Sequence, residues 1–210
     1  LLQNFNMKKT ILLTIVLTFM SLLVYGQLKF EEKDKIFDGK TFTNWEVPEN
    51  NIWWKIDSKG ILSAISDSTK TGSTLWSEEK YNDFAIRLEF KMIDGIVDSG
   101  IFMRGESSEN VQIQIGISGS LKRDMTASPY VPKKGYPIEA LKDHTDLLKQ
   151  KDWNSLEVHA IANHYYVWLN GLAVLDYTLK NANLIGPVGL QLHPGKTMNI
   201  QFKNIFLKTL

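Results

Sequence analysis

The stretch FAIRLEFKM, residues 84–92, alternates apolar and polar side chains one by one. Two shorter runs of the same kind follow, GIFMR at residues 100–104 and VQIQI at residues 111–115. A period of two is typical of a β-strand that buries one face and exposes the other. Because turn-forming residues separate the three runs, we expect three neighbouring antiparallel strands.

If these strands are neighbours, their polar side chains lie side by side on one face of a sheet. Carboxylate, guanidinium and amide groups together supply donors and acceptors, which suits a ligand rich in hydroxyl groups such as a sugar. The alternative is the ordinary solvated face of an antiparallel sheet, with no ligand. The residues concerned are Arg87, Glu89, Arg104, Gln112 and Gln114.

The rest of the chain repeats the strand pattern at short, regular spacing, with one weak helical stretch at residues 138–149. Roughly a dozen short strands predict an all-β fold, an antiparallel sandwich of two sheets. We see no boundary inside residues 27–210, which we interpret as a single domain. Alternation stops between residues 117 and 152, where three prolines occur. A loop of that length in a compact domain is usually functional or disordered, and we favour a lid or rim.

The beginning of the chain has the composition of a secretory signal peptide. Met7 is followed by two lysines, residues 11–24 are almost entirely apolar, and small residues precede Gln27. We therefore interpret residues 1–26 as a start extension and a cleaved signal peptide, and expect a periplasmic or secreted protein. A retained membrane anchor is the alternative, but the apolar run is short and a strongly polar stretch follows it.

Composition excludes several classes of function. The chain has no cysteine, so disulfides, thiolate metal sites and a lipid anchor on cysteine are excluded. Without the two lysines before residue 27, 22 basic residues face 23 acidic residues, a net charge of about −1. Nucleic acid and anionic membranes call for a clustered positive field, so we expect neither as a partner. No phosphate loop, zinc signature or calcium loop is present, and we expect no metal and no cofactor.

Two kinds of chemistry are open to the polar residues. Glycoside hydrolysis usually needs two carboxylates a few ångströms apart, and Glu89 and Glu106 are candidates. A single carboxylate with a nearby histidine suits proton abstraction next to a carbonyl group. His193 is the histidine of interest, because it shares strand parity with Gln191 and is followed by a Pro-Gly turn. A purely structural histidine is the alternative.

Several short motifs follow one another along the chain: IFDGK at residues 36–40, YNDF at 81–84, DSGIFMR at 98–104, LNG at 169–171, GPVGLQLH at 186–193 and FKNI at 202–205. Their succession resembles the 3-keto-disaccharide hydrolase domain, formerly domain of unknown function 1080. The match covers about residues 34–208, nearly the whole chain after the signal peptide.

This resemblance implies a concanavalin-like jelly roll and a role in carbohydrate breakdown. Some members act on glycosides oxidised at sugar C3, where the keto group acidifies the C2 proton and the aglycone can leave by elimination. A carbohydrate is then the expected partner, with Glu89 and His193 as catalytic base and acid. The residues expected to orient the sugar are Arg87, Arg104, Gln112, Gln114 and Gln191.

One departure from the family pattern matters. Where many members carry a glutamate and, further on, an aspartate, this chain has QIQIGI at residues 112–117, so Gln112 replaces the glutamate and the aspartate is absent. Either Glu89 takes the catalytic role of that glutamate, or the protein is a non-catalytic carbohydrate-binding module of the same fold. A third interpretation, an envelope scaffold without a ligand, predicts that the polar side chains are scattered over different surfaces.

Overall fold

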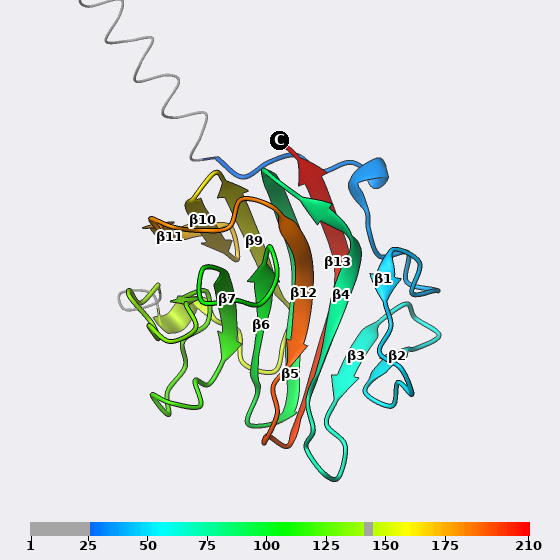
Figure 1. Cartoon of the computed structure of the whole chain (residues 1–210). Helices are drawn as coiled ribbons and strands as arrows, with labels where there is room; N and C mark the ends of the chain where they lie inside the picture. The colour runs from blue at the N-terminus through cyan, green and yellow to red at the C-terminus, as the bar shows by residue number, and fades with distance from the viewer. Residues whose placement is uncertain (1–25, 141–144) are drawn as a thin grey trace, which may run out of the picture.

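A computed structural model describes residues 26–140 and 145–210 of the chain. The signal peptide predicted for residues 7–26 lies outside the described residues except for Gly26. Within the described part, no helix has the length and apolar character needed to cross a bilayer. The described residues form two packed antiparallel sheets and two short 3₁₀ helices, η1 (Glu32–Asp34) and η2 (Thr145–Leu147), so the predicted all-β jelly-roll sandwich is confirmed (Figure 1).

The first layer is a six-stranded sheet in the order β1-β4-β12-β6-β7-β8. In Figure 1 its central strands lie in front of the second layer. The bounds of its strands are β1 Trp45–Glu46, β4 Ser73–Tyr81, β6 Asp98–Met103, β7 Val111–Gly116, β8 Pro129–Tyr130 and β12 Gly186–Leu192.

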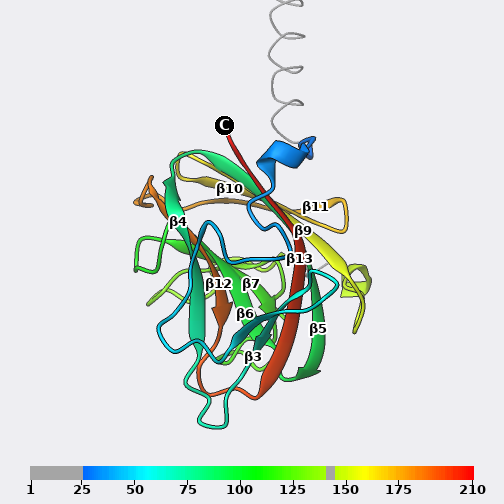
Figure 2. The ribbon, with the colours of Figure 1, turned by 90° about the vertical axis from the view of Figure 1, so that its right-hand side faces the viewer.

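The second layer is a seven-stranded sheet in the order β11-β10-β9-β5-β13-β3-β2. Figure 2 shows the two layers from the side, with β4, β6 and β12 in one and β5 and β13 in the other. The bounds of its strands are β2 Trp54–Ile56, β3 Leu62–Ile65, β5 Phe84–Gly95, β9 Asn154–Ile161, β10 His164–Leu169, β11 Leu172–Thr178 and β13 Met198–Thr209.

The core lies between the two sheets and is built by the alternation seen in the sequence. On β5, Ile86, Leu88 and Phe90 are fully buried, while the polar residues between them stay half-buried on the outer face. The inner faces of β6, β7 and β12 contribute further members of the same cluster, among them Ile101 and Leu190. Each such side chain stabilises the fold by about 1.5–3 kcal/mol through apolar burial.

The three runs that decide the fold do not all become neighbours. Strands β6 and β7 pair directly, as predicted, but β5 belongs to the other sheet. The link after β5 is not a hairpin, because it crosses from one sheet to the other with Val97 buried. It runs beside the matching crossover between β12 and β13, where the Ile96 amide donates to the Thr197 carbonyl oxygen at 3.2 Å. A hairpin and a crossover between sheets have the same period-two pattern in the sequence. The pattern shows that a strand has one buried face, but it does not show to which sheet the strand belongs.

The long segment after β7 is an ordered wall over the six-stranded sheet as far as it is described. It contains β8, and its turns are fixed by a bridge between Ile117 and Asp124 and another between Val131 and Gly135. Every residue of β7 is buried, including those on its outer face, because this wall covers them. The segment therefore forms the rim that the sequence suggested, and it creates a sheltered space.

Candidate functional site

A hollow of about 560 Å³ lies on the outer face of the six-stranded sheet. Its floor comes from β6, β7 and the end of β12, and its walls come from the 117–136 segment and the turn after β12. We call it the first hollow. Its polar and aromatic lining residues include Asp98, Phe102, Glu106, Gln112, Gln114, Ser118, Tyr130, Tyr136, Gln191, His193 and Lys196.

Two glutamines form a fixed amide pair on the floor. Gln112 Nε2 donates to Gln191 Oε1 at 2.8 Å, and Gln112 is only 3% exposed. The Gln112 side chain lies across Gly100 of the neighbouring strand, where an added Cβ atom would stand 2.3 Å from Gln112 Nε2. A glycine is needed there so that the amide can lie flat on the sheet. The outcome is a rigid surface whose remaining amide groups can bond hydroxyl groups of a ligand.

Asp98 places a buried carboxylate beside this amide pair. The residue is 3% exposed, and its Oδ1 accepts a hydrogen bond of 2.9 Å from Gln114 Nε2. Its Oδ2 has no hydrogen-bond partner among the described residues, although Lys196 Nζ lies 3.8 Å away. A buried acceptor without a donor is costly, so a ligand hydroxyl group that donates to Oδ2 gains affinity from that position.

His193 stands at the end of β12 with one ring nitrogen engaged. Its Nδ1 lies 2.6 Å from the Pro194 carbonyl oxygen. Since a carbonyl oxygen only accepts, Nδ1 must carry the proton in that contact, and the neutral ring then has its lone pair on Nε2. The contact therefore leaves Nε2 of the neutral imidazole as a proton acceptor, on a residue that lines the first hollow.

Aromatic residues complete the walls. Tyr130 and Tyr136 pack with their ring centroids 5.2 Å apart. Burial, with a smaller contribution from the nearby Asp98 charge, raises the pKa of Tyr136 to about 12, so its hydroxyl group keeps its proton and can donate to a ligand. Phe102, which lines the hollow, packs against Trp76 over Gly189, with ring centroids 5.2 Å apart and planes tilted by 31°.

The first hollow brings together four of the residues predicted from the sequence: Gln112, Gln114, Gln191 and His193. Glu106, the second carboxylate considered there, also lines it. The sequence pattern did not identify Asp98, Lys196 or Tyr136 as site residues. A signal was available for Asp98, which shares the strand parity of Gly100 and Phe102 and therefore faces the same side.

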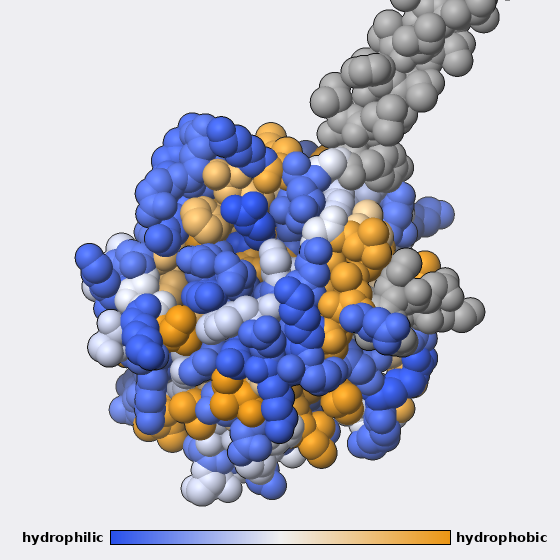
Figure 3. All heavy atoms as spheres, turned by 180° about the vertical axis from the view of Figure 1, so that it is seen from behind, coloured by the Kyte–Doolittle hydropathy of each residue, from blue (hydrophilic) through white to orange (hydrophobic). Residues whose placement is uncertain are grey.

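Glu89 and Arg87 lie on the other sheet, so the prediction that Glu89 and His193 share one site is wrong. Both residues are on the outer face of β5, in a separate hollow of about 470 Å³ with Gln27, Ser155, Asn204 and Phe206. We call it the second hollow. It belongs to the face seen in Figure 3, where hydrophilic side chains predominate. The sandwich separates Glu89 from both His193 and Glu106, because β5 turns its polar residues away from the six-stranded sheet.

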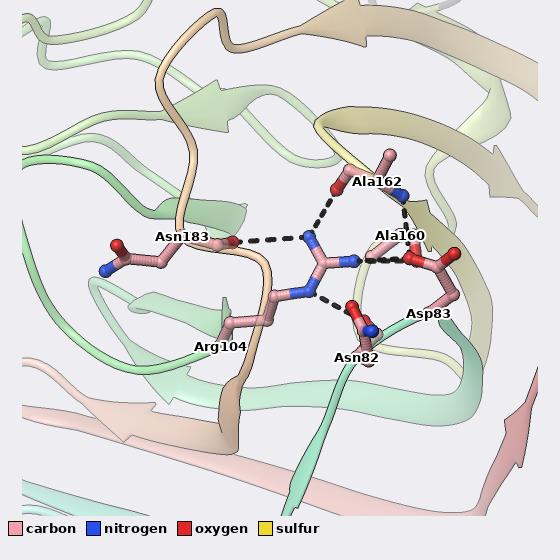
Figure 4. Close-up of polar contacts among 6 residues, drawn as sticks. All are labelled: Asn82, Asp83, Arg104, Ala160, Ala162 and Asn183. Carbon is pink, nitrogen blue, oxygen red and sulfur yellow. Dashed lines mark hydrogen bonds and ion pairs between the residues drawn. The ribbon is translucent and has the colours of Figure 1, made fainter.

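Arg104 binds the protein itself and not the first hollow, which corrects its predicted role in orienting a sugar. It has φ +63° directly after β6, which turns the side chain away from the face that its strand parity predicts. The guanidinium is buried and joins three connections of the fold (Figure 4). Its partners are the carbonyl oxygens of Asn82 at 2.7 Å, Ala160 at 3.0 Å, Ala162 at 2.6 Å and Asn183 at 3.5 Å, and Asp83 Oδ1 at 3.3 Å.

Metal ligands are sparse in the described part of the chain. Within residues 26–140 and 145–210, no three His, Asp or Glu side chains lie close enough together to hold a metal ion. The positive charge beside Asp98 is instead the ammonium group of Lys196. The polar groups of the first hollow are suited to proton transfer and to hydrogen bonding with hydroxyl groups.

The chain is similar to known proteins in its sequence and in its fold. The sequence profile of the 3-keto-alpha-glucoside-1,2-lyase-like domain matches residues 32–208. A comparison with curated protein sequences gives no match.

Several solved structures share the fold at low sequence identity. Two are provisionally named glycosyl hydrolases from Parabacteroides distasonis ATCC 8503. The first has a TM-score of 0.64 at 19% identity, covering 87% of this chain and 100% of that one. The second has a TM-score of 0.61 at 17% identity, covering 87% and 98%. The carbohydrate-binding module CBM66 from Bacillus subtilis has a TM-score of 0.52 at 14% identity, covering 79% and 96%.

Proposed function

Because the chain belongs to the 3-keto-alpha-glucoside-1,2-lyase-like domain family, we propose that it cleaves the glycosidic bond of 3-keto-glycosides in the first hollow. The observation that carries the proposal is the placement of one basic nitrogen and one buried carboxylate in the same hollow. His193 Nε2 is the base, and Asp98 Oδ2 is the free acceptor. The signal-like N-terminal sequence supports the same role outside the cytoplasm.

The reaction follows from the acidity that a 3-keto group gives to the C2 proton. His193 Nε2 takes that proton, the C2–H electron pair forms a C1–C2 double bond, and the bond from C1 to the glycosidic oxygen breaks. The proton held by His193 then passes to the leaving oxygen. Negative charge that develops on the keto oxygen is stabilised by a cation, and Lys196 is the cation of this hollow. Addition of water across the double bond completes a net hydrolysis.

The other groups of the hollow hold the sugar. Asp98 Oδ2 accepts from one hydroxyl group, the amide pair of Gln112 and Gln191 bonds others, and the Tyr136 hydroxyl group donates. These contacts fix the C2 proton against the imidazole, which is the main requirement for a reaction with a modest base.

A direct assay tests the proposal. The purified protein is incubated with a 3-keto-disaccharide, and the released sugar is measured over time. We expect turnover that falls at least about 100-fold in His193→Ala, because loss of a positioned general base typically costs that much. Glu89→Gln serves as the matched control and keeps full activity, since Glu89 lies in the second hollow.

A second function is favoured by one observation. Gln112 replaces the glutamate of many family members and is paired with Gln191, so the floor of the first hollow carries amides where a catalytic carboxylate would stand. This arrangement suits a carbohydrate-binding protein without turnover. The same assay separates the two functions: no released sugar, together with a saturable change in tryptophan fluorescence on adding the keto-sugar, means binding only.

A further inference from the structure

We propose that the second hollow binds the carboxylate of an acidic sugar, a hexuronic acid, through the guanidinium of Arg87. This site lies on the seven-stranded sheet, and the first hollow lies on the six-stranded sheet. The inference is therefore independent of the reaction proposed above.

Arg87 differs from the other two arginines of the sequence. Arg104 donates to four carbonyl oxygens and one carboxylate, and Arg123 bonds to Glu139. Arg87 makes no hydrogen bond and no ion pair within the part of the chain that the structure describes. A half-buried guanidinium with all its N–H groups available is an unusual feature, because these donors normally find acceptors.

Two phenyl rings hold the Arg87 guanidinium in place. It lies 4.5 Å from the ring centroid of Phe30 and 5.4 Å from that of Phe206. Cation–π contacts of this kind hold the charged group against the rings without using its N–H donors. A planar fork with a free edge matches the two oxygens of a carboxylate, which it binds bidentately.

The nearby carboxylates of the protein do not neutralise Arg87. Glu89 on the same face is engaged by Asn204 Nδ2 at 2.7 Å and by Lys203 Nζ at 3.2 Å. Glu157 lies directly across from Arg87 in the paired strand. Its two oxygens instead accept from the Leu28 amide at 2.8 Å and Gln27 Nε2 at 3.2 Å, and contact His159 Nε2 at 2.7 Å. The positive charge of Arg87 is thus left for a ligand.

The rest of the second hollow offers groups that bond hydroxyls. Ser155 lies opposite Glu89 in the sheet, and its hydroxyl group makes no hydrogen bond among the described residues. Glu89 retains lone pairs beyond the two contacts it makes, so it can accept from a hydroxyl group beside the serine. A sugar acid is the kind of ligand that offers a carboxylate to Arg87 and hydroxyl groups to Ser155 and Glu89. A simple anion satisfies only the first of these contacts.

The test uses the ¹H–¹⁵N signals of the arginine Nε–H groups in the purified, ¹⁵N-labelled protein. The Arg87 signal is assigned by its loss in Arg87→Lys. Sodium D-galacturonate is then added, with D-galactose and sodium acetate in parallel samples. We expect a saturable shift of the Arg87 signal with galacturonate, and at least about tenfold weaker binding of galactose and of acetate, since each lacks one set of contacts.

Two variants complete the design, with binding measured by calorimetry and folding by thermal unfolding. Arg87→Lys keeps the charge but loses the fork, and we expect at least about tenfold weaker galacturonate binding. Arg123→Gln, the matched control at another arginine, leaves binding unchanged. The proposal is overturned if galactose or acetate binds as tightly as galacturonate, or if folded Arg87→Lys binds galacturonate like the unchanged protein.

Discussion

The two hollows contain similar kinds of side chain, yet they are suited to different tasks. In the first, Asp98 is buried with one oxygen unbonded, and His193 presents a basic nitrogen. In the second, the Glu89 carboxylate is paired with Lys203, and the group left available is the Arg87 cation. Residue type alone therefore does not define a site. The group that keeps an unused donor or acceptor determines whether a hollow is suited to proton transfer or to binding an anion.

The largest expected effect tests the contrast between the carboxylates of Asp98 and Glu89. Asp98→Asn keeps the shape of the side chain but removes the charge beside Lys196 and part of the acceptor capacity. We expect turnover of a 3-keto-disaccharide to fall about 10- to 100-fold, while Glu89→Gln changes it less than twofold. Initial rates of sugar release measure both.

If Glu89→Gln lost more turnover than Asp98→Asn, the reaction would belong to the second hollow and not to the first. Thermal unfolding of both variants provides the control, since a partly unfolded Asp98→Asn protein would lose activity for an unrelated reason.

The second prediction contrasts the two arginines that the sequence placed in one patch. Arg104→Met removes five hydrogen bonds of a buried guanidinium, among them the buried bond to the Ala160 carbonyl oxygen, so we expect a loss of about 3–5 kcal/mol in the free energy of unfolding. Arg87→Met removes no hydrogen bond within the described residues, and we expect a loss below about 1 kcal/mol. Urea unfolding of the two variants gives the values, and equal losses would contradict the distinct roles of the two residues.

The third prediction concerns the floor of the first hollow. In Gly100→Ala the new Cβ atom meets Gln112 Nε2 at 2.3 Å and the Ile113 carbonyl oxygen at 2.7 Å, so the amide pair must move. We expect a loss of about 1–3 kcal/mol in stability and weaker binding of keto-sugars. Galacturonate binding to the second hollow is the internal control and stays unchanged. A variant that affects both ligands equally would show that the two hollows are coupled.

The smallest expected effect concerns Tyr136 in the wall of the first hollow. Its pKa is raised to about 12 by burial, so the folded protein holds this proton more tightly than the unfolded chain, in which tyrosine titrates near 10. The stability linked to Tyr136 is therefore complete below about pH 10 and falls as the pH rises from 10 towards 12. The difference in ultraviolet absorbance between the protein and Tyr136→Phe, followed against pH, reports the titration. A midpoint near 10 would mean that Tyr136 is solvated.

Sequence patterning was sufficient for the strands and for part of the first hollow. Alternation at residues 84–92 and 111–115 predicted β5 and β7, and the shared parity of Gln191 on β12 and His193 just after it agrees with their common place in the first hollow. These successes share a cause. Each depends only on neighbouring residues within one strand, where side chains point alternately to opposite faces.

The all-β class, the family and the polar identity of each strand face follow from the order of residues along the chain. The membership of β5 in the other sheet and the inward turn of Arg104 at φ +63° depend on how the strands pack together. The physical reason is that a period-two pattern carries no information about whether a link forms a hairpin or crosses between sheets. The crossover after β5 therefore separates Glu89 from His193 by the thickness of the core, and it gives each sheet a hollow of its own.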